Sequence, residues 1–274
     1  MGGAVARALR GTCGVTQNRL FACDKDSNAL SAALREGLIG KSFDESRAGE
    51  ILALCDVVFL CLNPSSIIYF IEQWKDSFKS GCLVTDIAGT KTSIAQAAEN
   101  FREDADFIPG HPMAGAEKSG FDNSGLCNFN GKNYILTPIS RNKPENIEFL
   151  KKLIIDMGFS RITQVTPEEH DRKIAFTSQL CHVIAAALID CESDTEITRF
   201  GGGSFEDLTR IAMLNAPMWT ELFIENRSAL LERVNKFENS LDDLKTLIGS
   251  DNADELEKRL KNIRERRIAM SGRN

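Results

Sequence analysis

The residue types best suited to chemistry lie in residues 107–121, which read Phe-Ile-Pro-Gly-His-Pro-Met-Ala-Gly-Ala-Glu-Lys-Ser-Gly-Phe. His111 stands between two prolines that restrict the backbone on either side of it. An imidazole held in this way after an apolar stretch can exchange a proton near neutral pH. The segment therefore predicts acid-base chemistry at His111, and the alternative is a turn whose histidine is merely solvated.

The composition favours a soluble globular protein in a reducing compartment. Its 274 residues suffice for two domains, and the formal net charge of -6 disfavours nucleic acid or an anionic membrane as the main partner. No apolar run approaches the about 20 residues of a membrane span, and the first ten residues lack the apolar core of a signal peptide. The eight cysteines form no CxxC pair, so we expect a cytoplasmic protein with free thiols and no metal site.

The first half of the chain alternates strands and helices. Apolar runs predict strands at 19–24, 56–62, 82–86, 133–137 and 161–165, and helical patterns cover 27–36, 67–78, 92–101 and 144–157. This alternation predicts a doubly wound parallel sheet covered by helices on both faces. Ligands bind beyond the carboxyl ends of the strands in such sheets. Four polar residues fall at or just after those ends: Asp24, Asn63, Asp86 and His111.

From residue 166 onward the pattern is helical. Thr166 and Pro167 mark a helix start, with a hydroxyl N-cap followed by proline at the first helical position. The predicted helices cover 167–191, 205–214, 218–237, 239–248 and 251–269. The fold prediction is therefore an α/β domain at 1–165 followed by an all-α domain at 166–274.

Five motifs stand in one order along the chain. They are Val84-Thr-Asp-Ile-Ala-Gly-Thr-Lys91, Pro109-Gly-His-Pro-Met-Ala-Gly-Ala-Glu-Lys-Ser-Gly120, Pro167-Glu-Glu-His-Asp171, Phe200-Gly-Gly-Gly-Ser-Phe-Glu-Asp-Leu-Thr-Arg-Ile-Ala212 and Pro217-Met-Trp219. Through them the chain resembles the prephenate/arogenate dehydrogenases of tyrosine biosynthesis over essentially its whole length. The resemblance implies a Rossmann-like nucleotide-binding domain followed by an all-α dimerisation domain.

The chemistry implied by the resemblance is an oxidative decarboxylation. Hydride leaves ring C4 of prephenate for NAD(P)⁺, the C4 hydroxyl becomes a phenol, and the C1 carboxylate departs as carbon dioxide. By the same resemblance His111 is the base, and Arg210 binds a substrate carboxylate, to which a guanidinium fork is suited. Other residues that the resemblance places around the substrate are Glu117, Ser178, Gln179, His182, Gly203 and Trp219, with Gly203 delivered across a dimer interface.

Two positions depart from the family pattern. Gly89 stands where the family usually carries a serine expected to bond the catalytic histidine, and the adjacent Thr90 or a water is expected to supply that hydroxyl. Gln179 replaces a histidine of the family and keeps hydrogen-bonding capacity without carrying charge. The preference between prephenate and arogenate therefore stays open.

The amino-terminal segment lacks part of the expected nucleotide site. A dinucleotide-binding domain has a first strand followed by GxGxxG, whereas Met1-Gly2-Gly3-Ala4 matches only the end of that turn. We expect a truncated or late-starting chain, with weak NAD binding and low stability. Asp24 is placed to bond a ribose 2′-hydroxyl and so favours NAD over NADP. The expected cofactor contacts are Gly2, Gly3, Asp24, Asn63, Pro64, Asp86 and Gly89.

The leading functional hypothesis is an NAD-dependent prephenate dehydrogenase that makes 4-hydroxyphenylpyruvate. Arogenate dehydrogenase is the close alternative, because the two substrates differ only in the side chain. A hypothesis of another class is a non-catalytic dimeric relic that lost cofactor binding together with its first strand. The helical half carries more apolar surface than one small domain can bury, so we expect a homodimer.

Overall fold

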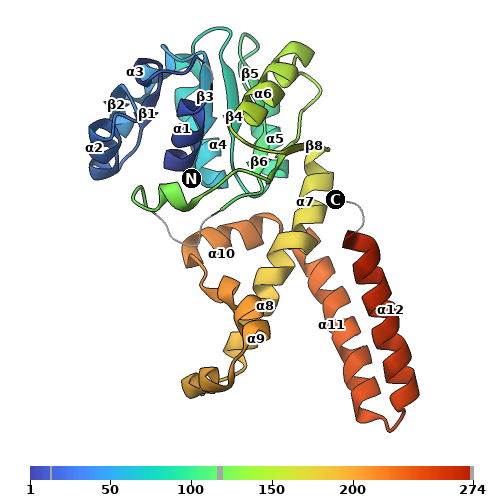
Figure 1. The fold of residues 1–274 in the computed structure, drawn as a ribbon. Coiled ribbons are helices and arrows are strands. Elements are labelled where there is room, and N and C mark those ends of the chain that lie inside the picture. The colour runs from blue at the N-terminus through green and yellow to red at the C-terminus, as the bar shows by residue number, and fades with distance from the viewer. Residues whose placement is uncertain (13, 116–119, 272–274) are drawn as a thin grey trace. The chain divides into compact units, whose positions relative to one another are not determined.

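The computed structural model describes residues 1–12, 14–115 and 120–271, and the chain divides into two compact units, Met1–Asn226 and Arg227–Asn274 (Figure 1). This division differs from the boundary predicted at 165/166, because the first four α-helices after that boundary belong to the larger unit. A domain boundary at residue 165 stays a prediction. All the chemistry described below lies within the first unit.

The strands of the first unit form three hydrogen-bonded sheets. β1 pairs with β2 in parallel, β3, β4 and β5 form a parallel sheet, and β6 pairs antiparallel with β7, which pairs in parallel with β8. Their bounds are β1 Phe21–Cys23, β2 Lys41–Phe43, β3 Val57–Leu60, β4 Leu83–Asp86, β5 Asp106–Ile108, β6 Gly110–Pro112, β7 Asn133–Leu136 and β8 Arg161–Gln164.

Helices cover both faces of these strands. The bounds are α1 Gly2–Arg10, α2 Ser27–Arg35, α3 Ala48–Leu52, α4 Pro64–Trp74, α5 Thr92–Glu99 and α6 Pro144–Asp156. Val84 of β4 is fully buried against Ile67 of α4 and Ile94 of α5 in one core cluster. A second cluster joins α1 and α6 to β7. The alternation of parallel strands and covering helices confirms the predicted Rossmann-like fold.

In the described part of the chain only β4 and β7 have a hydrogen-bonded strand on each side, so β1 and β3 are among the edge strands. Among the described residues β1 pairs only with β2, and β3 pairs only with β4. In a doubly wound sheet the first strand lies between the strands that correspond to these two. Each of these two strands thus has one edge without a hydrogen-bonded strand among the described residues.

Four elements of this part were not predicted from the pattern, namely β2, α3, β5 and β6. Each has only three to five residues, too few to show a clear hydrophobic period. The predicted loop around His111 is in fact β6, and its antiparallel pairing with β7 departs from an all-parallel sheet. The flanking prolines are compatible with this short strand because Gly110 and Pro112 stand at its two ends.

The helical part begins with one long run that changes its winding midway. α7 (Pro167–Ile174) continues through a π-helical turn at Ala175–Gln179 into α8 (Leu180–Asp190), where the sequence predicted a single regular helix at 167–191. After a 3₁₀ segment at Thr195–Phe200 follow α9 (Gly203–Thr209), a 3₁₀ turn at Arg210–Ala212 and α10 (Ala216–Glu225). π-helical turns are often found at functional sites because they redirect side chains.

The prediction of one helix at 218–237 was wrong. The chain breaks at Asn226, and α11 (Arg227–Gly249) then runs unbroken through the gap predicted at residue 238. The break has a tertiary cause, since the buried Asn226 side chain donates hydrogen bonds to two other segments. The last helix is α12 (Ala253–Ser271), which pairs with α11 as a helical hairpin. Shorter 3₁₀ turns lie at Gln17–Arg19, Glu45–Arg47, Lys75–Ser77 and Ser124–Leu126.

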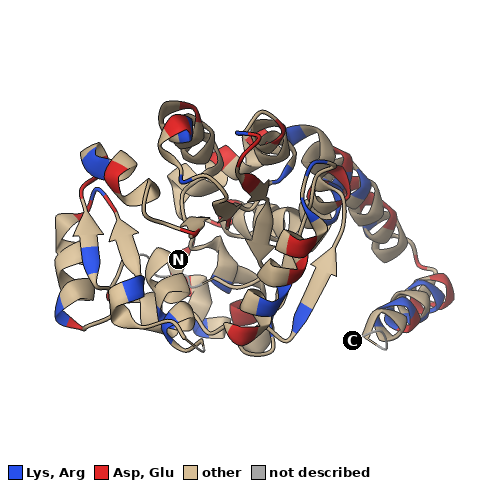
Figure 2. Cartoon of the chain, turned by 90° about the horizontal axis from the view of Figure 1, so that it is seen from above, with Lys and Arg blue, Asp and Glu red and all other residues tan. Residues whose placement is uncertain are grey.

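The run Pro167–Asp190 is long and apolar enough to span a membrane by length and composition. It nevertheless carries the buried polar residues His170, Asp171 and Gln179, which are hydrogen-bonded inside the first unit. Those bonds tie the first half of the run to the folded first unit. Figure 2 shows Lys and Arg interspersed with Asp and Glu along the helices.

Candidate active site

His111 is held by β6 through its neighbour Gly110. The Gly110 N–H donates to Asp86 Oδ1 at 3.0 Å, which ties β6 to the end of β4. A Cβ on Gly110 would lie 2.6 Å from Tyr134 Cε1, so only glycine lets the strand approach β7 this closely. The Tyr134 hydroxyl in turn donates to the Asp86 carbonyl at 3.1 Å. The imidazole therefore projects from a fixed backbone.

A second histidine from α7 contacts His111. His111 Nδ1 lies 2.9 Å from His170 Nε2, and His170 Nδ1 lies 2.8 Å from Asp171 Oδ1. Ionised Asp171 only accepts, so His170 carries its proton on Nδ1 and accepts at Nε2. His111 must then donate from Nδ1, which leaves the lone pair of its Nε2 for another proton. This relay of two histidines and a carboxylate defines His111 as a proton acceptor.

The environment keeps His111 neutral. Burial, together with the nearby His170 and Lys91, holds the pKa of His111 well below its ordinary value of 6.5. Burial also lowers the pKa of His170, even though its hydrogen bond to Asp171 acts in the opposite direction. Both rings are therefore uncharged at neutral pH, as a general base requires.

Asp171 anchors the relay to the loop after β4. Its Oδ1 also accepts from the Lys91 N–H at 2.8 Å, and its Oδ2 accepts from the Thr92 N–H at 2.9 Å and the Thr92 hydroxyl at 2.6 Å. Burial opposes ionisation, but the hydrogen bonds from His170 and Thr92 hold the pKa of Asp171 below its ordinary value. The carboxylate thus stays charged and fixed.

A fully buried ion pair lies behind the relay. Lys91 Nζ bonds Asp86 Oδ2, and neither side chain is exposed. Burial lowers the pKa of Lys91, while its attraction to Asp86 opposes that shift. Asp86 also accepts from the Ala88 and Gly110 N–H groups. Asp86 was predicted as a cofactor contact, but this burial and bonding give it the different role of fixing Lys91 and β6.

The two departures from the family pattern lie beside α10. A Cβ on Gly89 would lie 3.1 Å from Leu222 Cδ2, so the side chain of Leu222 fills the space next to Gly89. A cofactor contact at Gly89 stays a prediction. Thr90 is 2% exposed, and its hydroxyl has no hydrogen-bond partner in the described part of the chain. A catalytic role for Thr90 stays a prediction.

The helical segments bring several predicted substrate residues together. The rings of His182 and Trp219 stack with centroids 3.7 Å apart, and His182 Nδ1 lies 2.9 Å from the Ser178 carbonyl. Burial, opposed by that hydrogen bond, lowers the pKa of His182, and the charge of Arg210 lowers it further. Arg210 is exposed, so an anionic ligand can reach it from solvent.

Two predicted substrate residues within the described part of the chain, Gln179 and Gly203, are not joined to this group. Gln179 is 1% exposed, and both ends of its amide bond protein atoms. Gly203 is exposed at the start of α9, and a Cβ there would meet nothing within 4 Å. Glu117 lies outside the described residues.

The nucleotide side consists of strand ends and helix starts. Gly2 and Gly3 open α1, the exposed Asp24 directly follows β1, and Asn63 with Pro64 begins α4 after β3. An exposed acid at the end of β1 fits a ribose, and a helix N-terminus fits a pyrophosphate. These residues fit a dinucleotide, although the described residues supply only the helix part of its phosphate cradle.

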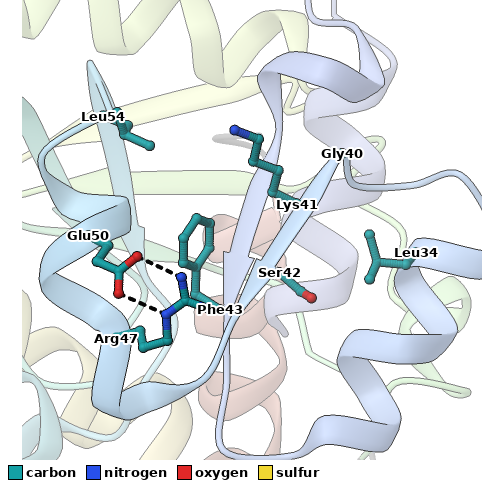
Figure 3. Close-up of a pocket in the computed structure, with 8 residues that line it drawn as sticks. All are labelled: Leu34, Gly40, Lys41, Ser42, Phe43, Arg47, Glu50 and Leu54. Carbon is teal, nitrogen blue, oxygen red and sulfur yellow. Dashed lines mark hydrogen bonds and ion pairs between the residues drawn. The ribbon is translucent and has the colours of Figure 1, made fainter.

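A separate hollow of about 520 Å³ lies beside the edge strand β2 (Figure 3). In it the Arg47 guanidinium is paired with Glu50 by two hydrogen bonds. The lining residues are Leu34, Gly40, Lys41, Ser42, Phe43, Arg47, Glu50 and Leu54. None belongs to the relay or to the predicted site, so the hollow is not where the chemistry lies.

Several residues hydrogen-bonded around His111 were not predicted from the sequence to have a role. His170 and Asp171 stood in a noted motif without a role, and Lys91, Thr92 and Asn226 received none. The signal for the first pair was a His-Asp dipeptide at the start of a helix in a chain with three histidines. Nothing local marked Asn226, whose partners are 47 and 55 residues away.

Comparison with known proteins gives matches over both halves of the chain. The family model described as prephenate dehydrogenase, nucleotide-binding domain, matches residues 5–163, and that described as prephenate dehydrogenase, dimerization domain, matches 166–262. A prephenate dehydrogenase of Bacillus subtilis is 27% identical over 262 residues, which are 93% of this chain and 70% of the relative.

Solved structures show the same similarity. The chain resembles prephenate dehydrogenase of A. aeolicus in complex with hydroxyphenyl propionate and NAD⁺, with a TM-score of 0.86 at 28% identity over 98% of this chain and 94% of that one. It also resembles Synechocystis arogenate dehydrogenase, with a TM-score of 0.79 at 27% identity over 98% and 96% of the two chains.

Proposed function

Because the chain belongs to the prephenate dehydrogenase family, we propose that it oxidatively decarboxylates prephenate to 4-hydroxyphenylpyruvate with NAD⁺ as the hydride acceptor. The observation that carries the proposal is the relay His111–His170–Asp171, which leaves one imidazole lone pair for a substrate proton. A folded relic without activity would have no use for a neutral histidine held by a buried carboxylate.

His111 acts as the base and then as the acid of the proposed reaction. His111 Nε2 accepts the proton of the C4 hydroxyl, and the oxygen electrons form the C4–O double bond as hydride leaves C4. The bond from C1 to the carboxylate then breaks, its electrons complete the aromatic ring, and His111 returns the proton to the phenolate oxygen. Bound NAD⁺ supplies the hydride acceptor. General-base catalysis of this kind contributes about 10²–10⁴-fold.

Charge and stacking orient the substrate. We assign Arg210 to a substrate carboxylate, since it is exposed and close enough to His182 to affect its pKa. The stacked His182 and Trp219 form an aromatic wall near that cation. On the nucleotide side Gly2, Gly3, Asn63 and Pro64 would hold the pyrophosphate end of the cofactor, and the Asp24 carboxylate would bond the ribose, which favours NAD over NADP.

Arogenate is the second candidate substrate, because a protein of similar structure is an arogenate dehydrogenase. It differs from prephenate by an amino acid in place of a keto acid in the side chain. The experiment is steady-state formation of NADH with each compound in one preparation. Turnover with prephenate at the higher kcat/KM supports the proposal, a preference for arogenate selects the alternative, and turnover with neither contradicts both.

The active form is proposed to be a cytoplasmic homodimer. Apolar side chains of the helical part remain exposed in the single chain, among them Phe176, Leu188, Ile189 and Phe200, the last 88% exposed. The model that matches 166–262 is named for dimerisation. Light scattering that shows a dimer at micromolar concentration supports this assembly, whereas a monomer contradicts it.

A further inference from the structure

Two buried amides join α10 to the π-helical turn behind the relay. Gln179, the last residue of that turn, is 1% exposed, and Asn226, where α10 ends, is 6% exposed. Asn226 Nδ2 donates to Gln179 Oε1 at 2.7 Å, and Gln179 Nε2 donates to the Leu222 carbonyl at 2.9 Å. Both polar atoms of the Gln179 amide and the amide nitrogen of Asn226 are thus bonded to protein atoms.

The same Asn226 amide reaches the relay. Its Nδ2 also donates to the Asp171 carbonyl, at 2.9 Å. The backbone of Asp171 is therefore held from α10 while its carboxylate is held by the loop after β4. A displacement of Asp171 would move the acceptor that determines which nitrogen of His170 carries the proton.

We propose that Gln179 and Asn226 are positioning residues that keep His111 in its proton-accepting tautomer by fixing Asp171. The proposal rests on the proposed function, since it assigns these residues to the base of that reaction. If Asp171 shifts, His170 can carry its proton on Nε2 and donate to His111 Nδ1. The His111 proton then sits on Nε2, and the base is blocked.

The position of Gln179 requires a donor and an acceptor on one neutral side chain. The Leu222 carbonyl needs a donor, and the Asn226 amide needs an acceptor. A protonated glutamic acid meets both needs, but a glutamate ion meets only the second, and burial without a partner raises the pKa of such a carboxyl. The variant Gln179→Glu therefore makes the proposed clamp sensitive to pH.

The first test is the pH profile of Gln179→Glu in the full-length chain with prephenate and NAD⁺. At low pH we expect a kcat near that of the unchanged protein. As pH rises and the introduced carboxyl ionises, kcat should fall by about tenfold or more, as outer-layer partners of a functional histidine commonly require. The KM for NAD⁺ should not change. The exposed Gln96→Glu is the matched control and should show no new descending limb.

The second test reads the tautomers directly and needs no turnover. The chain has only three histidines, so ¹⁵N spectra of their side chains are simple to assign. In the unchanged protein we expect His111 and His170 to be protonated on Nδ1 at neutral pH. In Asn226→Ala a substantial Nε2–H population should appear on both rings.

The outcomes separate this proposal from the proposed function. A Gln179→Glu profile parallel to that of the unchanged protein, or tautomers unchanged in Asn226→Ala, overturns the positioning role. If the unchanged protein turns over neither substrate, the proposed function fails, and the spectra alone then decide whether the two amides set the tautomer.

Discussion

Around His111, side chains from three segments bond one another inside the protein, whereas on the nucleotide side β1 and β3 each pair with one neighbour only among the described residues. The two regions belong to one unit of the chain. The first is fixed by side chains, chiefly those of Asp86, Lys91 and Asp171, and the second depends on main-chain pairing. The geometry around His111 therefore rests on side-chain hydrogen bonds and not on the pairing of β1 and β3.

The largest effect is expected from a substitution of Asp171, which disrupts the hydrogen-bonded side chains around His111. Asp171→Asn removes the charge that holds the His170 proton on Nδ1, so the tautomer of His111 is no longer fixed. We expect kcat to fall by at least about 10²-fold, since the corresponding change in a Ser-His-Asp triad costs about 10⁴. Steady-state kinetics at saturating NAD⁺ measure this.

The control for this change is Asp156→Asn, which removes an exposed carboxylate at the end of α6 that pairs with Lys152. It should leave kcat unchanged. Retention of more than about a tenth of kcat in Asp171→Asn would show that the relay does not serve the base.

The dependence of the nucleotide side on strand pairing can be tested by adding a strand between β1 and β3. A fusion that places an apolar strand of about five residues and a Gly-x-Gly turn before Met1 should pair with β1 and β3. Each buried backbone group that gains a partner contributes about 1–3 kcal/mol. We expect a higher melting temperature and at least about tenfold tighter NAD⁺ binding, because the turn adds phosphate ligands.

Calorimetric titration and thermal melts measure these two effects. The matched control carries serine and proline in place of the apolar strand residues. It should raise neither the melting temperature nor the affinity for NAD⁺. If the apolar fusion leaves both quantities unchanged, β1 and β3 do not need a shared partner.

The smallest expected effect concerns Gly89, which lies in the loop after β4 and next to Leu222 of α10. Gly89→Ser puts a Cβ about 3.1 Å from Leu222 Cδ2, and overpacking of this kind costs about 1–3 kcal/mol. We expect a lower melting temperature and a few-fold lower kcat. The shorter side chain of Leu222→Val should relieve part of this crowding. The double variant should therefore have a higher melting temperature and a higher kcat than the sum of the two single effects predicts. Strictly additive effects would place Leu222 elsewhere.

The two regions also differ in what the sequence could predict. The strand-helix alternation was readable, because apolar periods are local. His111 was recognised from its motif as a candidate base. Its partner His170 was not, since the hydrogen bond spans 59 residues and depends on how α7 meets β6. The break at Asn226 and the π-helical turn were likewise hidden, because tertiary hydrogen bonds override helix propensity there.

The pH dependence of stability follows from the same histidines. Burial lowers the pKa of His111 and of His170 in the folded state, so the unfolded chain binds protons more readily. Their contribution is fully present above the ordinary value of 6.5 and is lost as pH falls through the lowered pKa values. The ring charge that ends catalysis at low pH therefore also weakens the fold.

The most direct measurement of the central claim is the pH dependence of kcat for prephenate oxidation, in the unchanged protein and in His111→Asn. Since only neutral His111 accepts the substrate proton, kcat should stay level as pH falls to 6.5 and decline only below it. His111→Asn should lose at least about 10²-fold in kcat and lack that acid limb. A limb at or above 6.5, or one that persists in His111→Asn, would contradict the account.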